Sequence, residues 1–339
     1  MFSEKLLRWY DKEKRQLPWR RVINNPYHIW LSEVMLQQTT VVTVIPYFQA
    51  FIQKWPTLQD LAAASLDEVL TLWQGLGYYS RARNLHKCAQ ILAQIFPRKE
   101  KELLKLPGIG PYTAAAIASI AFDQRAAAVD GNVLRVMSRY FAINAPKPVE
   151  EVKEKLTILL PHERCGDFTQ ALMELGALVC RPKNPFCQVC PVLEDCQAYS
   201  LGKVDVLPVK NLKQKLPTRY AAAYIIRRED GSLLLRKRPA QGLLGGMMEV
   251  PTTPWEETKR ESKGPIVKHT FTHFHFEVEV CHLRGSSGFE GIWVHPQDLK
   301  NYALPTLMKK IIKVGLSDSF EARENKKLVK DEKGLLYEK

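Results

Sequence analysis

The stretch LPGIGPYTAAAIASIAFDQRAAAVD, residues 106–130, decides the fold of the N-terminal part of this chain. Gly108 and Gly110 are separated by one residue, so the backbone can turn sharply there and approach a partner without interference from a Cβ atom. Pro111 suits the first position of a helix, because its missing N–H is no loss there. The apolar, Ala-rich run 112–122 predicts a buried helix, and the free N–H groups at its start suit a phosphate. The turn alone is more typical of an ordinary corner in a helical domain.

The chain has 339 residues, of which 45% are hydrophobic, so it is long enough for two domains with cores of their own. Residues 1–203 show helical patterns and little strand signal, which predicts an all-α domain. Residues 204–217 carry two prolines and several lysines and are interpreted as a linker. Residues 218–316 turn to strand patterns, which predicts an α+β domain. The charged tail 317–339 is expected to be disordered.

Three local patterns are specific enough to test against a structure. Residues 27–44, YHIWLSEVMLQQTTVVTV, are apolar over most of a helical circumference and predict one central helix that contains Glu33. The runs 221–228 and 232–238 flank a Glu-Asp-Gly turn, which predicts a β-hairpin. Residues 269–283, HTFTHFHFEVEVCHL, alternate strongly and favour a strand.

The charge balance points to a polyanionic partner. The formal net charge is +13 and the isoelectric point is about 9.3, which favours nucleic acid first and an anionic membrane second. No apolar run approaches the roughly 20 residues needed to span a bilayer. The sequence MFSEKLLRWYDKEKR at the start lacks the apolar core of a signal peptide. A cytoplasmic protein without a membrane partner is therefore expected, and its cysteines should be reduced or metal-bound.

Four of the seven cysteines fall within 17 residues, with the spacing C-x6-C-x2-C-x5-C: Cys180, Cys187, Cys190 and Cys196. Four thiolates so close in sequence suit one metal centre. A structural zinc ion and an iron–sulfur cluster both accept four cysteine ligands, so chemistry alone leaves the two open. The other three, Cys88, Cys165 and Cys281, are interpreted as simple thiols.

The segment LPGIGPYT, followed 20 residues after Gly110 by VDGNVLRV, resembles the helix-hairpin-helix DNA glycosylases. In that superfamily the hairpin grips the DNA backbone, and an Asp after the second helix, here Asp130, faces the sugar under attack. The cysteine spacing resembles that of the [4Fe–4S] cluster in the endonuclease III and adenine glycosylase branches. The resemblance implies that the cluster loop carries basic and polar side chains to DNA, here Arg181, Lys183 and Gln188.

The branch is indicated by two further segments. Endonuclease III-like enzymes carry a Lys nucleophile two residues after the second hairpin glycine; here that residue is Tyr112, which cannot form a Schiff base. WLSEVMLQQT resembles the monofunctional adenine DNA glycosylases of the MutY type, which remove adenine mispaired with 8-oxoguanine or G in double-stranded DNA. Their catalytic Glu corresponds to Glu33, whose apolar helix face raises a carboxyl pKa by desolvation. Asp130 would stabilise the cationic sugar.

The same resemblance implies supporting residues. Tyr112 would lie against the sugar and Asn132 would orient the catalytic groups, while Gln38 and Tyr78 would wedge into the base stack as adenine is flipped out. Either Arg20 or Arg21 would reach the adenine pocket, and Gln170 stands where many relatives have Glu.

Residues 218–316 resemble the Nudix-like C-terminal domain of this family, which recognises 8-oxoguanine. The REUxEE pattern that binds magnesium in Nudix hydrolases is absent, so no pyrophosphohydrolase activity is expected. The segment FTHFHF, 271–276, matches the loop that touches the lesion, through Thr272 and His273. A plain strand with alternating histidines and phenylalanines fits its periodicity equally well.

Three other functions remain open at this point. They are an endonuclease III-like glycosylase/lyase, a non-catalytic DNA-binding protein, and a Nudix hydrolase with a DNA-binding appendage. Tyr112 counts against the first, and the pair Glu33 and Asp130 counts against the second. The family resemblance also implies a monomer, nucleoid-associated in a bacterium, whose linker could recruit a replication clamp or another repair protein.

Overall fold

The computed structural model describes residues 1–22, 24–92, 95–146, 148–209, 215–259, 262, 264–284, 290–317, 328–330 and 336–338. Two compact units make up the chain, and each is described by itself. The first comprises Met1–Ala63 and Asn84–Leu212, and the second comprises Ala64–Arg83 and Lys213–Lys339.

The assignment of Ala64–Arg83 to the second unit differs from the sequence expectation, which placed this segment in the helical domain. Side-chain contacts account for the difference. Lys237 Nζ lies 2.6 Å from a carboxylate oxygen of Asp67, and the side-chain amide of Gln74 donates to the Tyr302 carbonyl at 2.8 Å.

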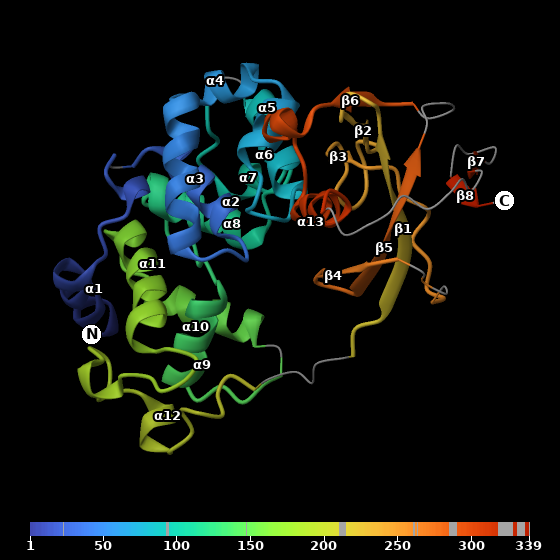
Figure 1. Ribbon diagram of the computed structural model, residues 1–339. Helices are drawn as coiled ribbons and strands as arrows, with labels where there is room; N and C mark the ends of the chain where they lie inside the picture. The colour runs from blue at the N-terminus through green and yellow to red at the C-terminus, as the bar shows by residue number, and fades with distance from the viewer. Residues whose placement is uncertain are drawn as a thin grey trace. The chain divides into compact units, whose positions relative to one another are not determined.

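The first unit is helical, as the sequence predicts (Figure 1). The helices up to residue 212 are α1 Phe2–Glu13, α2 Pro26–Leu36, α3 Val41–Lys54, α4 Leu58–Ala63, α5 Leu66–Leu72, α6 Ser80–Leu92, α7 Glu100–Leu103, α8 Pro111–Phe122, α9 Gly131–Tyr140, α10 Val149–Leu159, α11 Cys165–Glu174 and α12 Gln197–Ser200. Of these, α5 and the start of α6 belong to the segment 64–83 of the second unit. None of the helices in the described part of the chain is long and apolar enough to cross a membrane.

Helix α8 forms the centre of this unit. Its residues from Thr113 to Ala121 are all buried, and α2, α7 and α11 pack around it. The Ala-rich sequence explains the close packing, because small side chains let neighbouring helices approach from every side. Helix α2 is likewise buried from Tyr27 to Met35, so the two apolar helices place their polar side chains inside the unit.

The prediction of one helix over residues 27–44 is wrong. Helix α2 ends at Leu36, and α3 begins at Val41 with Thr40 as its N-cap. Between them Gln38 adopts a left-handed conformation with φ of 56°. The hydroxyl of Thr40 accepts a hydrogen bond from the Thr43 N–H, which competes with a continuous helix.

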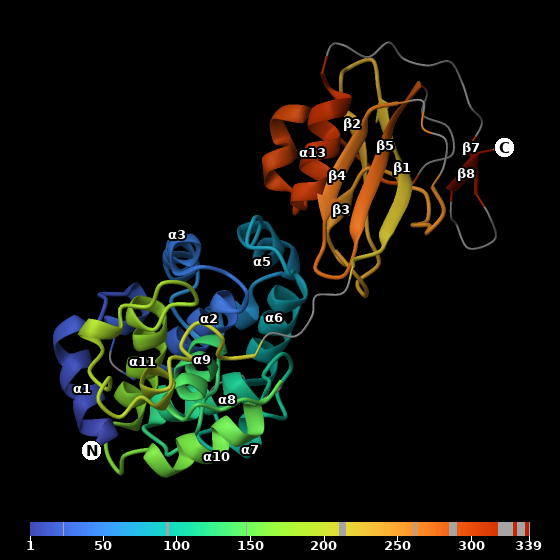
Figure 2. The same ribbon diagram turned by 90° about the horizontal axis from the view of Figure 1, so that it is seen from below.

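The second unit contains a mixed sheet with strand order β3-β2-β1-β5-β4, and β6 pairs with β2 (Figure 1). The strands are β1 Thr218–Arg227, β2 Leu233–Lys237, β3 Met248–Glu249, β4 Ile266–Thr270, β5 His275–Arg284 and β6 Ile292–Val294. Strands β1 and β5 run parallel, and the other pairs are antiparallel. Helix α13, Thr306–Gly315, packs on β5, β4 and β1 (Figure 2).

The predicted hairpin around residues 229–231 is confirmed. Arg227 on β1 pairs with Leu233 on β2, and Gly231 has a φ of 85° in the turn. The Asp230 carboxylate accepts a hydrogen bond from the Ser232 N–H at 2.8 Å, as turn chemistry requires.

The reading of 269–283 as one strand is wrong, because the chain turns back in the middle of it. Phe271 and Phe274 close a tight turn through a 2.9 Å hydrogen bond from the Phe271 N–H to the Phe274 carbonyl, and β4 and β5 pair on either side. Thr272 and His273 are exposed at the tip of this turn. The alternation changes phase at Thr272 and His273, because Phe271 and Phe274 are three residues apart, and this change of phase marks the reversal.

Within the tail 317–339, expected to lack structure, two segments form strands. They are β7 Leu328–Lys330 and β8 Leu336–Glu338, which pair antiparallel. The Leu-Val and Leu-Tyr pairs in these segments have strand propensity that the surrounding charges obscure. Most of the remaining tail lies outside the described residues.

Candidate active site

A cleft of about 1410 Å³ in the helical unit gathers most of the residues that the sequence singles out. Its lining includes Glu33 from α2, Tyr112 from α8, and Asp130 and Asn132 around the start of α9. Gln38, from the break between α2 and α3, also lines it. This volume exceeds that of most small-molecule pockets, about 300–1,000 Å³, so a whole nucleoside fits.

Glu33 is a buried carboxyl group in the middle of α2. Asn25 caps this helix by accepting hydrogen bonds from two backbone N–H groups, and Pro26 occupies its first position. Glu33 is 6% exposed and is flanked along the helix by apolar residues. Burial raises its pKa from 4.5 to about 7; the nearby Asp130 adds to this rise, while the Tyr112 hydrogen bond and Arg20 oppose it. The group can therefore hold a proton near neutral pH.

Tyr112 projects from the first turn of α8 directly onto that carboxyl group. Its hydroxyl donates a hydrogen bond to Glu33 Oε2 at 2.6 Å. The pKa of the phenol lies well above its ordinary value because of its burial and the neighbouring carboxylates. Tyr112 therefore stays neutral and acts as a hydrogen-bond donor.

The hairpin before α8 has the conformation that its glycines predict. Gly108 has a φ of 75°, and a Cβ atom there would lie 2.7 Å from the Cβ of Asn84. A side chain at this position would therefore cause both strain and a clash. At Gly110, the N-cap of α8, an added Cβ would meet no atom within 4 Å. The backbone N–H groups at this helix start are thus open to approach by an anion.

Asp130 lines the same cleft as Glu33 and is the N-cap of α9. Its Oδ1 accepts a hydrogen bond from the Val133 N–H at 2.6 Å, and its Oδ2 accepts one from Asn132 Nδ2 at 2.9 Å. The two donors fix the direction of the carboxylate. Asn132 is thus placed to hold the Asp130 carboxylate in one orientation, and Asp130 also caps helix α9.

Sequence reasoning missed Arg135, which extends this network. Its Nη2 donates to Asn132 Oδ1 and to the Gly176 carbonyl, each at 2.8 Å, and its Nε donates to the Cys180 carbonyl at 2.7 Å. A continuous path of hydrogen bonds thus runs from Asp130 to the first residue of the cysteine cluster. Gly176 lies in a short π-helical segment, and a Cβ atom there would lie 2.6 Å from Asn132 Cβ.

The two arginines proposed for the pocket differ in their position. Arg20 lines the cleft, whereas Arg21 is exposed and is not part of the lining. Arg20 Nε donates to Gln170 Oε1 at 2.7 Å, so Gln170 also belongs to the cleft wall. The buried Glu174 pairs with Arg20 and Arg15, and sequence reasoning gave no sign of it.

The donor set of the four cysteines fits an iron–sulfur cluster. Buried Arg139 donates Nη1 to Cys180 Sγ at 3.3 Å. Such donors stabilise thiolates, the form that binds metal. Burial raises the pKa of the free thiols of Cys187, Cys190 and Cys196. Among the described residues, no three His, Cys, Asp or Glu side chains gather around a single-ion site.

Two predicted DNA-contacting residues meet in the second unit. The hydroxyls of Tyr78 and Thr272 lie 2.8 Å apart and share a hydrogen bond. Tyr78 is 42% exposed and has a φ of 46°, so it projects from a tight turn. His273 is exposed beside Thr272. The ring of Phe271, at the start of this turn, stacks on the ring of Trp255.

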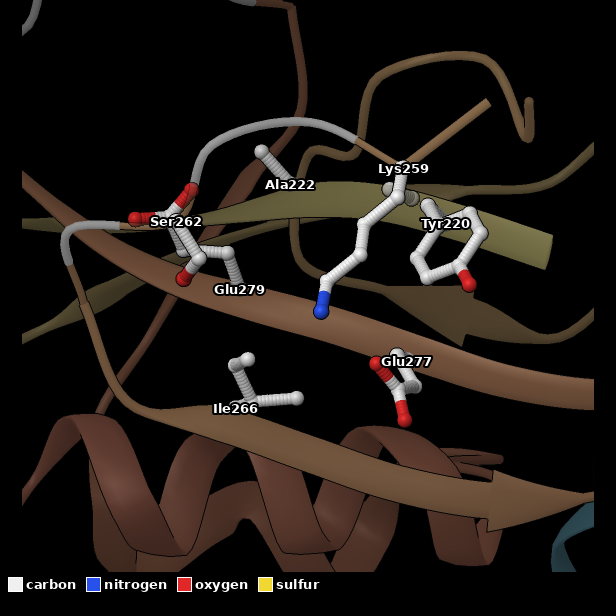
Figure 3. Close-up of a pocket in the computed structure, with 8 residues that line it drawn as sticks. Tyr220, Ala222, Lys259, Ser262, Ile266, Glu277 and Glu279 are labelled. Carbon is white, nitrogen blue, oxygen red and sulfur yellow. The ribbon is translucent and has the colours of Figure 1, made fainter. Parts of the chain in front are cut away.

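The sheet of the second unit has a small pocket at the β1–β5 pair. Lys259 and the carboxylates of Glu277 and Glu279 line it (Figure 3). Its volume of about 30 Å³ suits roughly one water molecule, which is far too small for a nucleoside triphosphate. Glu277 pairs with Lys268 at 3.1 Å, and Glu279 accepts from the Gly264 N–H.

Two family models match the chain, one in each of its predicted domains. Residues 31–162 match the family model of the HhH-GPD superfamily base excision DNA repair proteins, and residues 222–314 match that of the NUDIX domain. The fold of the helical part is similar to a structure of a thermostable thymine-DNA glycosylase, with a TM-score of 0.55 and 31% identity over 59% of this chain and 95% of that one. A non-covalent endonuclease III–DNA complex is similar with a TM-score of 0.51 and 28% identity, over 59% of this chain and 94% of that one.

Relatives cover nearly the whole chain. The adenine DNA glycosylase of Rattus norvegicus is 37% identical over 92% of this chain and 77% of that protein. The adenine DNA glycosylase of Buchnera aphidicola subsp. Schizaphis graminum is 32% identical over 93% of this chain and 98% of that protein. With the helical cleft, the Nudix-like sheet and relatives of this length, the chain belongs to the adenine DNA glycosylase family.

Proposed function

We propose that this protein removes adenine mispaired with 8-oxoguanine or G from double-stranded DNA, by hydrolysis and without cutting the strand. One observation carries the proposal. A tyrosine occupies the position at which the lyase branch has its lysine, and its hydroxyl lies 2.6 Å from the buried acid Glu33. The names of the relatives support adenine as the base.

Glu33 would supply the proton that the reaction needs. Adenine is a poor leaving group as an anion, so protonation of the base at N7 lowers the barrier to breaking the N-glycosidic bond. An ordinary glutamate is ionised at neutral pH, but burial raises the pKa of Glu33 to about 7. Tyr112 holds the carboxyl group in one orientation toward the cleft.

Asp130 would stabilise the sugar cation that forms as the base departs. Its carboxylate lines the same cleft and is fixed by Val133 and Asn132. A preorganised negative group beside a developing cation is among the strongest contributions to catalysis. Water then adds to the sugar and completes the hydrolysis, leaving an abasic site.

DNA contacts would come from both units. The exposed hairpin glycines, Gly108 and Gly110, would let a phosphate approach the backbone N–H groups at the start of α8. Gln38 and Tyr78 stand in left-handed turns that project their side chains, which suits wedging into a base stack. Thr272 and His273, exposed at the tip of the β4–β5 turn, would contact 8-oxoguanine.

A [4Fe–4S] cluster held by Cys180, Cys187, Cys190 and Cys196 would fix the loop that carries Arg181 and Lys183. Its role here is structural, and the hydrogen bond from Arg139 would favour the bound thiolate. Protein purified without oxygen should contain iron and acid-labile sulfide in equal amounts, and Cys190→Ala should lose both. Stoichiometric zinc without sulfide would contradict this assignment.

Single-turnover excision tests the proposed function. The substrates are duplexes with A opposite 8-oxoguanine, A opposite G, A opposite T, and thymine glycol opposite A, each quenched with and without alkali. Adenine loss from the first two, with strand breaks only after alkali, is the expected result. Cleavage of the thymine glycol strand without alkali would place the protein in the lyase branch.

A further inference from the structure

Glu174 is a fully buried carboxylate in the cleft wall that the proposed chemistry does not use. It ends α11 and is 1% exposed. Arg15 donates to it twice, with Nε to Oε2 at 2.7 Å and Nη2 to Oε1 at 3.0 Å. Arg20 pairs with the same Oε1 at 2.9 Å. One buried anion therefore holds two cations that line the cleft.

The guanidinium of Arg20 is fixed on three sides. Its Nη2 pairs with Glu174, its Nε donates to Gln170 Oε1 at 2.7 Å, and its Nη1 donates to the Arg15 carbonyl at 3.2 Å. A guanidinium has five N–H groups in a rigid plane. These three contacts orient that plane and leave two N–H groups for an acceptor in the cleft.

We propose that Glu174 is a positioning residue, which holds Arg20 toward the excised base and offsets part of its positive charge so that Glu33 remains protonated. The inference rests on the proposed function. It assigns to Glu174 a role in the electrostatics of the acid, beyond its packing in the helical core.

The charges around the acid show why neutralisation matters. The ionisable groups that act on Glu33 are Tyr112 on α8, Asp130 at the start of α9, and Arg20 in the turn before α2. The hydrogen bond from Tyr112 and the positive charge of Arg20 both lower the pKa of Glu33. A buried cation without its counter-ion would lower that pKa further. Glu174 supplies the counter-ion, and its own neighbours are Arg15, Arg20 and the phenol of Tyr10.

The test is the pH dependence of single-turnover adenine excision for wild type and Glu174→Gln. Glutamine keeps the shape and an acceptor oxygen but removes the charge. In Glu174→Gln the alkaline limb of the pH–rate profile, where the rate falls with rising pH, should move to lower pH by about half a unit or more. The rate at pH 8 should therefore drop about threefold or more relative to wild type. Affinity for a duplex with an uncleavable adenine analogue should change much less than the rate.

Two further variants separate an electrostatic role from a structural one. Arg15→Gln removes two hydrogen bonds to Glu174 but leaves the Arg20 pair, so its limb should not move to lower pH. The double variant Glu174→Gln/Arg20→Gln should lose the downward shift, because the unneutralised cation is gone. Three results would overturn the proposal. They are an unshifted pH profile in Glu174→Gln, an equal shift to lower pH in Arg15→Gln, and a remaining shift to lower pH in the double variant that lacks Arg20.

Arg20→Gln decides the matter if Glu174→Gln does not fold. This variant leaves Glu174 paired with Arg15, and its limb should move to higher pH because a cation that lowers the pKa of Glu33 has been removed. An unmoved limb would contradict the inference. Absence of adenine excision by the wild-type protein would instead refute the proposed function, so the two failures are distinguishable.

Discussion

The hydroxyl of Tyr112 lies 2.6 Å from Oε2 of Glu33 and donates a hydrogen bond to it. One side chain thereby does two things. It fills the position at which the lyase branch has its lysine, and it orients the carboxyl group that we propose as the proton donor to the base. The two residues come from α8 and α2, the most deeply buried helices of the unit.

Tyr112→Phe should move the alkaline limb of adenine excision to higher pH, by up to about one unit. The Tyr112 hydrogen bond lowers the pKa of Glu33, so its loss raises that pKa. The maximal rate should fall, because the carboxyl group is no longer held. Tyr27→Phe is the matched control, since the Tyr27 hydroxyl also makes one buried hydrogen bond, to the Trp55 carbonyl at 2.9 Å. Equal behaviour of both variants would contradict this explanation.

Glu33→Gln should abolish excision and stabilise the fold at alkaline pH. The pKa of Glu33 is raised from 4.5 to about 7 by burial, so the unfolded chain loses this proton more readily than the folded one. The wild-type free energy of unfolding should therefore fall between about pH 4.5 and pH 7, by about 3 kcal/mol at most. Urea denaturation at pH 5 and pH 8 measures the difference, and a stability gain that does not grow with pH would be evidence against a buried, titrating Glu33.

Asp130→Asn should abolish excision while leaving the fold nearly intact. Asparagine retains an acceptor oxygen for the Val133 N–H, so the cap of α9 survives while the negative charge is lost. Asp123→Asn is the control, because Asp123 also accepts backbone hydrogen bonds, from Gly166 and Arg164, yet does not line the cleft. Thermal melting and single-turnover rates report the two effects, and excision that survives in Asp130→Asn would show a purely structural aspartate.

Gly176→Ala should slow excision about tenfold or more by displacing Asn132. The added Cβ atom would lie 2.6 Å from the Cβ of Asn132, so the side chain that orients Asp130 must move. The rate defect should not add to that of Asn132→Ala in a double variant, because both changes act through one contact. Additive defects would mean that Gly176 acts elsewhere.

The sequence predicted those parts of the site that depend on local rules. The Gly108 turn and the buried helix after it followed from backbone freedom and composition, and the structure confirms both. The environment of Glu33 followed from the apolar circumference of its helix. The hydrogen bond between Tyr112 and Glu33 could not be predicted in this way, because hydrophobic patterns give no distance between side chains 79 residues apart.

Two errors in the predicted elements had local signals, whereas the role of Glu174 had none. The break at Gln38 falls in the polar stretch 37–40, and the capping residue Thr40 could have revealed it. The turn at Thr272 lies where two successive polar residues, Thr272 and His273, change the phase of the alternation, a local signal that the prediction of one strand overlooked. Glu174 looked like any other acid near a helix end, because only the folded chain places two arginines around it.

The pH dependence of single-turnover adenine excision opposite 8-oxoguanine tests the account most directly. Glu33 must carry a proton to act, and burial raises its pKa to about 7. The rate should therefore be constant below that pH and fall about tenfold per unit above it, with no excision in Glu33→Gln. A rate that is flat from pH 6 to pH 9, or a Glu33→Gln variant with full activity, would contradict the assignment of Glu33 as the acid.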